Sequence, residues 1–229
     1  MRMKRKRKQF RRRKKKMINK VIKIGKISTS RTELIDILKA WIVISLTFSF
    51  LFSGITLSSE EGFFSSLETG KFWITFLISL ITVGIGFLFH ELAHKFVAQH
   101  YGCVAEFRSF DEMLLLALGL AILIGFTFIA PGAVMISGMI TRKENGIISV
   151  AGPATNYVLA LIFLGLMLLI PSWSSVLSIG FSANLWLGLF NMIPFLNFDG
   201  VKIFRWNIPI WAGMVAFGIF FLFFFGRVF

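Results

Sequence analysis

The chain has 229 residues, of which 56% are hydrophobic and 28 are phenylalanine, and its mean hydropathy is +0.77. This composition excludes an ordinary water-soluble domain and indicates a polytopic membrane protein. The single cysteine excludes an intramolecular disulfide framework and a Cys-x-x-Cys metal site, and only three histidines are available as imidazole ligands. Any metal centre must therefore be built from very few residues.

The net charge of +14 is concentrated at the N-terminus, because fifteen of the 25 Lys and Arg residues lie within residues 1–26, which hold no acid. Basic clusters beside a membrane span commonly stay on the cytoplasmic side and contact anionic headgroups. We therefore expect residues 1–27 to form a basic cytoplasmic tail. Specific nucleic-acid binding is disfavoured, since the tail holds one aromatic residue, Phe10, and no fold to present base-reading side chains.

Next in chain order, Ser30-Arg31-Thr32-Glu33 has the spacing of a helix capping box and predicts a helix that begins near Arg31. Six apolar stretches follow, and each has about the 17–25 residues that cross an apolar slab of roughly 30 Å. They cover residues 40–55, 72–89, 113–130, 147–170, 175–192 and 208–225. Because the loops between them are short, we expect one membrane-embedded domain over residues 28–229. Its predicted fold class is all-α, a transmembrane bundle of five to six membrane segments.

The strongest chemical signal is His90-Glu91-Leu92-Ala93-His94, at the end of the second apolar stretch. On a helix, residues four apart share a face, so both imidazoles can bind one Zn²⁺ while Glu91 lies beside the ion as a general acid/base. The simpler alternative is a pair of helix-terminal histidines at the membrane surface. Three ionisable residues beside an apolar span are costly without a function, which favours the metal site.

A catalytic zinc ion usually takes three protein ligands, and the sequence offers two candidates for the third. His100 lies ten residues after His90, as in the metzincin pattern, but that pattern needs glycine where this chain has Val97. If the helix continues, His100 lies about 15 Å along the axis from His90, which is too far to share an ion. The favoured candidate is Asp199, an isolated carboxylate between two apolar segments, although it could simply be a loop residue that caps the last helix.

With these motifs the chain resembles the site-2 proteases, a family of intramembrane zinc metalloproteases. The HExxH motif of the family matches residues 90–94, its later N-x-x-P-x-x-x-x-D-G motif matches residues 191–200, and its shorter G-P-x-x-N feature matches residues 152–156. The resemblance covers residues 72–200, the expected core of the domain. It implies that one Zn²⁺ per chain is bound by His90, His94 and Asp199, with Glu91 as the catalytic acid/base.

The resemblance also implies that Asn191 binds the substrate backbone or the developing oxyanion, and Asn156 is a second substrate-binding candidate. We expect no PDZ or CBS domain, a feature in which the chain is similar to compact archaeal or bacterial members of the family.

The two long motifs can meet at one ion only if the chain crosses the membrane an even number of times between His94 and Asp199. Segments 147–170 and 175–192 supply two crossings, so we expect 113–138 to be re-entrant, with a short extended edge. This topology puts eight of the ten Lys and Arg residues outside the tail on the cytoplasmic side, whereas six full spans would put five on each side. Residues 130–138, with Pro131 and Gly132, would then line the site and offer an edge to an unwound substrate, unless Pro131 marks only an ordinary turn.

Together these features predict a multi-pass protein of the cell membrane, with a cytoplasmic N-terminus, that hydrolyses peptide bonds within or near transmembrane segments of other membrane proteins. Expected partners are such substrates, membrane lipids, and anionic headgroups at the basic tail. One alternative is an unrelated HExxH membrane peptidase whose site lies in a soluble domain, and the short loops argue against it. Another is a catalytically silent membrane scaffold or lipid-binding protein of the same fold, which need not keep Glu91.

Overall fold

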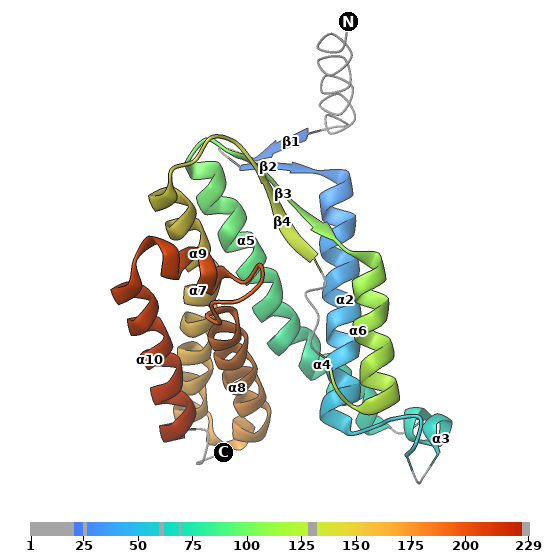
Figure 1. The fold of residues 1–229 in the computed structure, drawn as a ribbon. Coiled ribbons are helices and arrows are strands. Elements are labelled where there is room, and N and C mark those ends of the chain that lie inside the picture. The colour runs from blue at the N-terminus through green and yellow to red at the C-terminus, as the bar shows by residue number, and fades with distance from the viewer. Residues whose placement is uncertain (1–20, 25–26, 60–61, 69, 128–131, 226–229) are drawn as a thin grey trace, which may run out of the picture.

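A computed structural model describes residues 21–24, 27–59, 62–68, 70–127 and 132–225, so most of the basic tail lies outside the described part. Five helical stretches of that part are long and apolar enough to cross a membrane. They are Arg31–Ser53 (α2), Gly70–His100, Arg142–Leu169 (α7), Pro171–Asn191 and Ile208–Phe225 (α10). The predicted membrane-helix bundle is confirmed, with short strands at one end of it (Figure 1).

The first span begins at the residue that the capping-box sequence predicts. Ser30 is the N-cap of α2, and its hydroxyl accepts a hydrogen bond from the Glu33 amide at 3.2 Å. Before it, β1 (Val21–Ile24) and β2 (Ile27–Ser30) pair antiparallel. This strand pair includes residues 21–24, which belong to the stretch expected to form the basic tail.

The second span is one continuous helix that carries the HExxH motif. After the short helix α3 (Phe63–Glu68), it runs through α4 (Gly70–Ser79), the π-helical segment η1 (Leu80–Gly84) and α5 (Ile85–His100). A π-helical turn interrupts the regular hydrogen-bond ladder of a helix. Here the indole of Trp41 on α2 donates to the Leu80 carbonyl at 3.0 Å, which anchors the interrupted region about three turns before the motif.

The segment between the second and third spans leaves one end of the bundle and returns to it. β3 (Val104–Ser109) leads into α6 (Asp111–Ile124), and β4 (Gly132–Ser137) follows. The two strands pair antiparallel with Ser109 opposite Gly132, so the stretch between them begins and ends at the same place. With 14 residues, α6 is shorter than the five membrane-long helices. This is the arrangement expected for a re-entrant 113–138 with a short extended edge; Pro131 lies outside the described residues.

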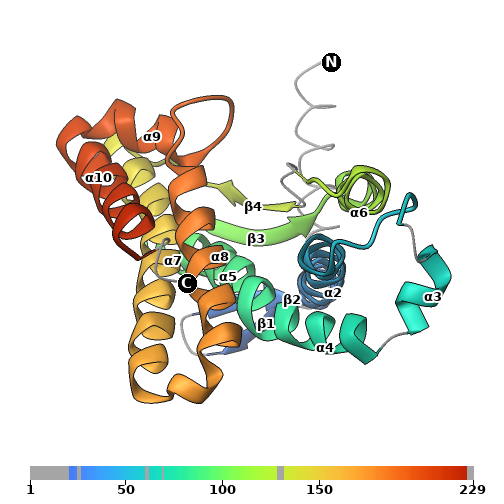
Figure 2. The same ribbon diagram turned by 90° about the horizontal axis from the view of Figure 1, so that it is seen from below.

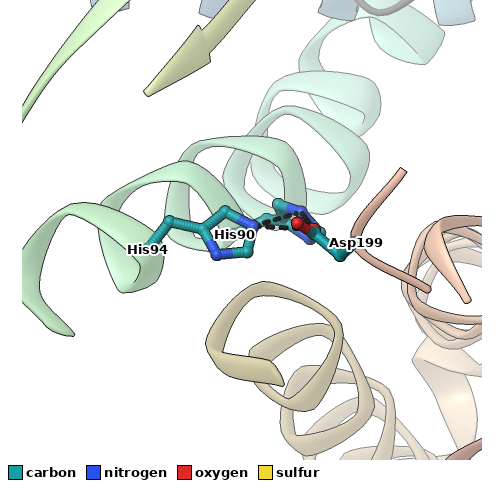
Figure 3. Close-up of side chains that lie close together, drawn as sticks. All are labelled: His90, His94 and Asp199. Carbon is teal, nitrogen blue, oxygen red and sulfur yellow. Dashed lines mark hydrogen bonds and ion pairs between the residues drawn. The ribbon is translucent and has the colours of Figure 1, made fainter. Parts of the chain in front are cut away.

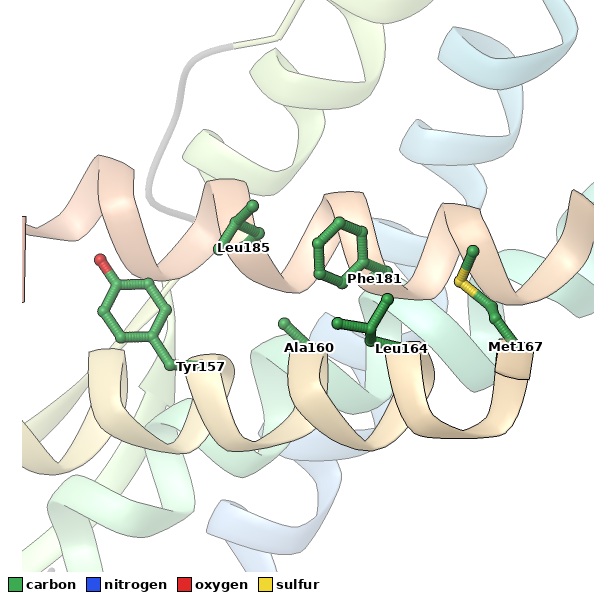
Figure 4. Close-up of a cluster of buried hydrophobic side chains, with 6 residues drawn as sticks. All are labelled: Tyr157, Ala160, Leu164, Met167, Phe181 and Leu185. Carbon is green, nitrogen blue, oxygen red and sulfur yellow. The ribbon is translucent and has the colours of Figure 1, made fainter. Parts of the chain in front are cut away.

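The third, fourth and fifth spans pack as a separate group. A buried cluster lies between α7 and α8 (Ser174–Asn191) (Figure 4). Partly buried side chains of α10 pack against it. The cluster consists of Tyr157, Ala160, Leu164 and Met167 on α7, and Phe181 and Leu185 on α8. Because lipid tails are as apolar as these side chains, close packing rather than exclusion from water holds such helices together.

A cleft of about 660 Å³ separates this group from α2 and α6. In Figure 2, α2, α4 and α6 lie on one side and α7, α8 and α10 on the other, with α5 and the strand pair β3–β4 between them. The cleft walls come from α2 and α6 on one side and α8 on the other, and they are mainly apolar. His90 and Glu91 of α5 line the same cleft, so the motif borders an opening between the helices.

An ion pair with almost no solvent exposure joins the first span to the motif helix. The Lys95 ammonium lies 2.7 Å from Glu33 Oε2, and the two side chains are 2% and 0% exposed. The Glu33 carboxylate also accepts hydrogen bonds from Thr29 Oγ1 at 2.7 Å and from the Phe107 amide of β3 at 2.8 Å. The Glu33 carboxylate therefore holds α2, α5 and β3 together. Its contact on α5 is Lys95, the residue that directly follows His94.

Replacement of Lys95 by Met is expected to lower the free energy of unfolding by about 3–5 kcal/mol, because Glu33 would remain as an unpaired buried charge. Lys39→Met is the matched control, since Lys39 pairs with Asp36 and Asp111 where its side chain is 35% exposed, and exposed pairs contribute about 0–1 kcal/mol. Denaturant unfolding of the full chain in detergent measures both losses. Equal losses for the two variants would contradict the role given to the buried pair.

Candidate metal centre

The two histidines of the motif lie one turn apart on α5, and both imidazoles are buried (Figure 3). Their Nε2 atoms are 3.0 Å apart, so the two rings already converge on one point. This is the geometry that the four-residue spacing predicts for two ligands of a single ion.

Asp199 reaches the same point from the other end of the sequence. It is the first residue of α9 (Asp199–Trp206), and its Oδ2 lies 2.9 Å from His94 Nε2 and 3.4 Å from His90 Nε2. One donor atom from each of the three residues lies within 4.8 Å of the others, and all three side chains are buried. Two imidazole nitrogens and one carboxylate oxygen are donors that zinc prefers, so the residues present fit the ion.

The start of α9 is fixed against the end of α8, which explains how Asp199 is placed. At Gly200 an added Cβ would lie 2.2 Å from the Met192 carbonyl oxygen, so only glycine allows this approach of the two backbones. The same carbonyl accepts a hydrogen bond from the Trp211 indole of α10 at 2.8 Å. Three helices therefore meet where the carboxylate enters the site.

The carboxylate of Asp199 is held at both oxygens. While Oδ2 faces the histidines, Oδ1 accepts a hydrogen bond from the Lys202 ammonium at 3.2 Å.

Helix α7 holds the second nitrogen of each imidazole. His94 Nδ1 lies 2.7 Å from the Ile148 carbonyl oxygen, and His90 Nδ1 lies 2.6 Å from Asn156 Oδ1. Because both partners are acceptors, both Nδ1 atoms carry the hydrogen and both Nε2 lone pairs remain for a metal. The Asn156 side chain is fully buried, and its amide nitrogen donates to the Gly86 carbonyl and to Asn184 Oδ1, each at 3.1 Å.

The space in front of the histidines exists because α7 carries a glycine there. A Cβ at Gly152 would lie 2.4 Å from His94 Nε2 and 2.5 Å from His90 Nε2, and would fill the position where the donor atoms converge. Gly152 belongs to the G-P-x-x-N feature, whose role the sequence alone did not explain.

Glu91 is half-buried on α5, and the strand β4 sets the direction of its carboxylate. Its Oε2 accepts a hydrogen bond from the Val134 amide at 3.1 Å. This contact places the predicted acid/base between the metal site and the edge of β4, on the wall of the cleft. No side-chain pattern marks a backbone amide, which is why the sequence did not reveal Val134.

Of the other residues predicted from the sequence, two line the cleft and His100 lies apart from the metal site. His100 is exposed at the end of α5, and it is not part of the one group of converging donors found among the described residues. Gly132 and Asn191 line the cleft, and the amide nitrogen of Asn191 donates to the Leu187 carbonyl at 2.8 Å. Lys202 and Asn184 were not predicted, although a polar residue within an apolar span such as Asn184 is a usable signal.

Comparison with known proteins shows the class of protein to which the chain is similar. MJ0611 of Methanocaldococcus jannaschii, named for zinc metalloprotease activity, is 50% identical over 143 residues, which are 61% of this chain and 75% of that protein. Two further relatives are also named as zinc metalloproteases. YwhC of Bacillus subtilis is 27% identical over 57% of this chain and 68% of its own length. Rip2 of Mycolicibacterium smegmatis is 32% identical over 48% of this chain and 49% of its own length. No protein-family model and no solved structure matches the chain.

The chain belongs to the site-2 protease family of zinc metalloproteases. Zinc is accordingly its cofactor, and the group formed by His90, His94 and Asp199 is able to hold one ion. The recognition made from the two sequence motifs is confirmed, as are the membrane and metalloprotease classes that followed from it.

Replacement of Gly152 by Ala is expected to reduce the zinc content of the purified protein to near zero, because the new methyl group occupies the position where the donors converge. Gly165→Ala is the matched control on the same helix, since nothing lies within 4 Å of a Cβ at that position. Metal analysis of both variants in detergent reports zinc per chain. Full zinc content in Gly152→Ala would show that the ion binds elsewhere.

Proposed function

We propose that the protein is an intramembrane protease that hydrolyses peptide bonds within or near the transmembrane segments of membrane-protein substrates. One observation carries the proposal: the buried His90, His94 and Asp199 group and the adjacent Glu91 border an apolar cleft within a bundle of membrane-long helices. A soluble substrate would need a site outside the bundle, whereas a membrane-spanning one can reach this cleft from the bilayer.

In this proposal His90, His94 and Asp199 are the zinc ligands. When bound, zinc supplies Lewis-acid activation of a water molecule and of the scissile carbonyl group. The residues around it have preparatory roles: Ile148 and Asn156 hold the two imidazoles, and Lys202 holds the Asp199 oxygen that points away from the histidines. The site is thereby preorganised with three ligand atoms directed at one point.

Glu91 is proposed as the catalytic acid/base. It removes a proton from the attacking water as the oxygen bonds to the scissile carbonyl carbon, and it delivers that proton to the amide nitrogen as the C–N bond breaks. The hydrogen bond from the Val134 amide occupies Oε2 and leaves Oε1 to carry the proton. An intact acid/base beside the ligands is the observation that favours an enzyme over a catalytically silent scaffold.

Glu91→Gln is expected to retain zinc and to lower cleavage of a reconstituted single-span substrate by about 10²–10⁴-fold, the range of general acid–base catalysis. Glu112→Gln, on α6, is a control that leaves the site untouched. Mass spectrometry of the fragments measures cleavage and metal analysis measures zinc. Undiminished cleavage by the Glu91 variant would refute its role, and loss of zinc would instead make it a structural residue.

The substrate segment is proposed to bind as an extended strand along β4. Successive residues of a strand point their backbone groups to alternate sides, and the Val134 amide points away from β3 toward Glu91. Gly132 and Ile136 share that parity, so their backbone groups face the same free edge. An unwound segment that adds there lies beside Glu91, with Asn191 and Pro131 as further candidate contacts. Asn156 is better suited to hold His90, because its amide hydrogens are already used.

Ile136→Pro is expected to weaken substrate cleavage while zinc content stays unchanged, because proline removes one amide hydrogen from the free edge of β4. Ile136→Val keeps that hydrogen and a similar side chain, and serves as the control. Initial cleavage rates over a range of substrate densities in proteoliposomes give the measurement. Equal rates for the two variants would exclude strand addition at this edge.

The orientation of the protein is also part of the proposal. The basic residues 1–26 place the N-terminus in the cytoplasm, where they contact anionic headgroups, and the five spans make the chain a multi-pass membrane protein. The strand pair at the tail end of the bundle then lies toward the cytoplasm, from which water reaches the metal centre (Figure 1).

A further inference from the structure

Asn184 is a fully buried amide in the middle of α8, a membrane-long helix. A polar side chain at such a position is unfavourable unless all its hydrogen-bonding groups are satisfied. Its amide nitrogen donates to the Gly180 carbonyl at 2.9 Å, and its oxygen accepts from Asn156 at 3.1 Å. Asn184 therefore joins α8 to the residue that holds His90.

The direction of these hydrogen bonds is determined by two backbone carbonyls. A carbonyl oxygen only accepts, so Asn184 turns its nitrogen to Gly180, and Asn156 turns its nitrogen to Gly86. The oxygen of Asn184 is then left to accept the second hydrogen of Asn156. The oxygen of Asn156 is left for His90 Nδ1, which must carry the hydrogen, and the Nε2 lone pair of His90 faces Asp199 and His94.

The two histidines differ in what holds them. His94 is held by the main chain, because its partner is the Ile148 carbonyl. His90 is held by a side chain, which is itself held by Gly86 and Asn184. The orientation of His90 is consequently the one that can be changed by substitution at a distance from the metal.

Helix α8 can approach α5 closely at Asn184 because α5 has a glycine, Gly86, opposite it. At Gly86 an added Cβ would lie 2.3 Å from Asn184 Oδ1, so the glycine provides the space that the amide occupies. Gly86 lies one turn before His90 on the same face of α5. Asn184 thus lies against α5 one turn before His90 and contacts the residue that holds His90.

We infer that Asn184 is a positioning residue of the metal centre, which acts through Asn156 to fix the ring orientation and the hydrogen-bearing nitrogen of His90. This inference rests on the proposed function, because it requires His90 to be a zinc ligand. It concerns affinity for the metal, and it predicts a measurable effect in the protein without any substrate.

The test is the zinc affinity of the full chain in detergent, measured by competition with a chromophoric chelator. Asn184→Leu, which keeps the approximate size but removes both hydrogen bonds, is expected to weaken zinc binding by about 10–100-fold, the usual effect of losing a partner of a metal ligand. Leu185→Ala is the control, because Leu185 is the buried neighbour on α8 within the Tyr157 cluster. It loosens the same helix and is expected to leave zinc affinity unchanged.

A double variant shows whether Asn184 acts through Asn156. Asn156→Leu weakens zinc binding, and Asn156→Leu with Asn184→Leu is expected to be no weaker than Asn156→Leu alone, since the same connection is already broken. If Asn184→Leu does not fold, Asn184→Ser provides the test, because its hydroxyl can bond within the helix, as Ser45 does to the Trp41 carbonyl, without reaching Asn156.

Three results would overturn the inference: unchanged zinc affinity in a folded Asn184 variant, an equal loss in Leu185→Ala, or additive losses in the double variant. Asp199→Ala separates this failure from failure of the proposed function. If Asp199→Ala loses zinc and the Asn184 variants do not, the metal site stands and only the role of Asn184 is refuted. If Asp199→Ala keeps zinc, the ligand set itself is refuted.

Discussion

The close approach of α7 to α5 at the two histidines is the constraint on which the metal centre depends. Ile148, Gly152 and Asn156 are spaced four residues apart, so they lie on one face of α7. On that face, the Ile148 carbonyl oxygen binds His94 and the side-chain oxygen of Asn156 binds His90. Between them, Gly152 leaves empty the space where the donor atoms converge. Any side chain at the middle position would separate the helices or fill the site, so the ligands of α5 and the glycine of α7 require each other.

Glu91, the proposed acid/base, is positioned by a different route, through the strand pair. Phe107 and Val134 lie opposite each other on β3 and β4, and both direct their amides outward. The Phe107 amide donates to the buried Glu33, and the Val134 amide donates to Glu91. A carboxylate therefore lies at each edge of the two-stranded sheet. Glu33 is fixed by its ion pair with Lys95, and Glu91 lines the cleft. The buried pair thereby connects the first span, through the strand pair, to Glu91, the proposed acid/base.

The sequence predicted the parts of this molecule that depend on side-chain identity or helical periodicity. The spacing of His90 and His94, the isolation of Asp199 and the five long apolar helices follow from such patterns. The strands β1 to β3 do not, because short strands depend on pairing between distant residues, whereas the extended edge expected over residues 130–138 corresponds to β4. The partners of Glu91 and His94 are backbone groups, which no residue type marks. His100 was disfavoured as a ligand from the sequence because Val97 stands where the metzincin pattern needs glycine, and α5 does continue as a helix beyond the motif.

The strand edge also addresses the cost of unwinding a helix inside a membrane. A helical substrate shields its carbonyls with its own hydrogen bonds, and each group freed by unwinding is costly where no water is available. On β4, Gly132 and Ile136 can replace those lost bonds on either side of Val134, whose amide is already bound to Glu91. A substrate held by the flanking residues would therefore have its unpaired peptide group opposite Val134. In the proposed mode of binding that peptide group is the one nearest to Glu91, so the strand that compensates the cost of unwinding would also select the bond to be cut.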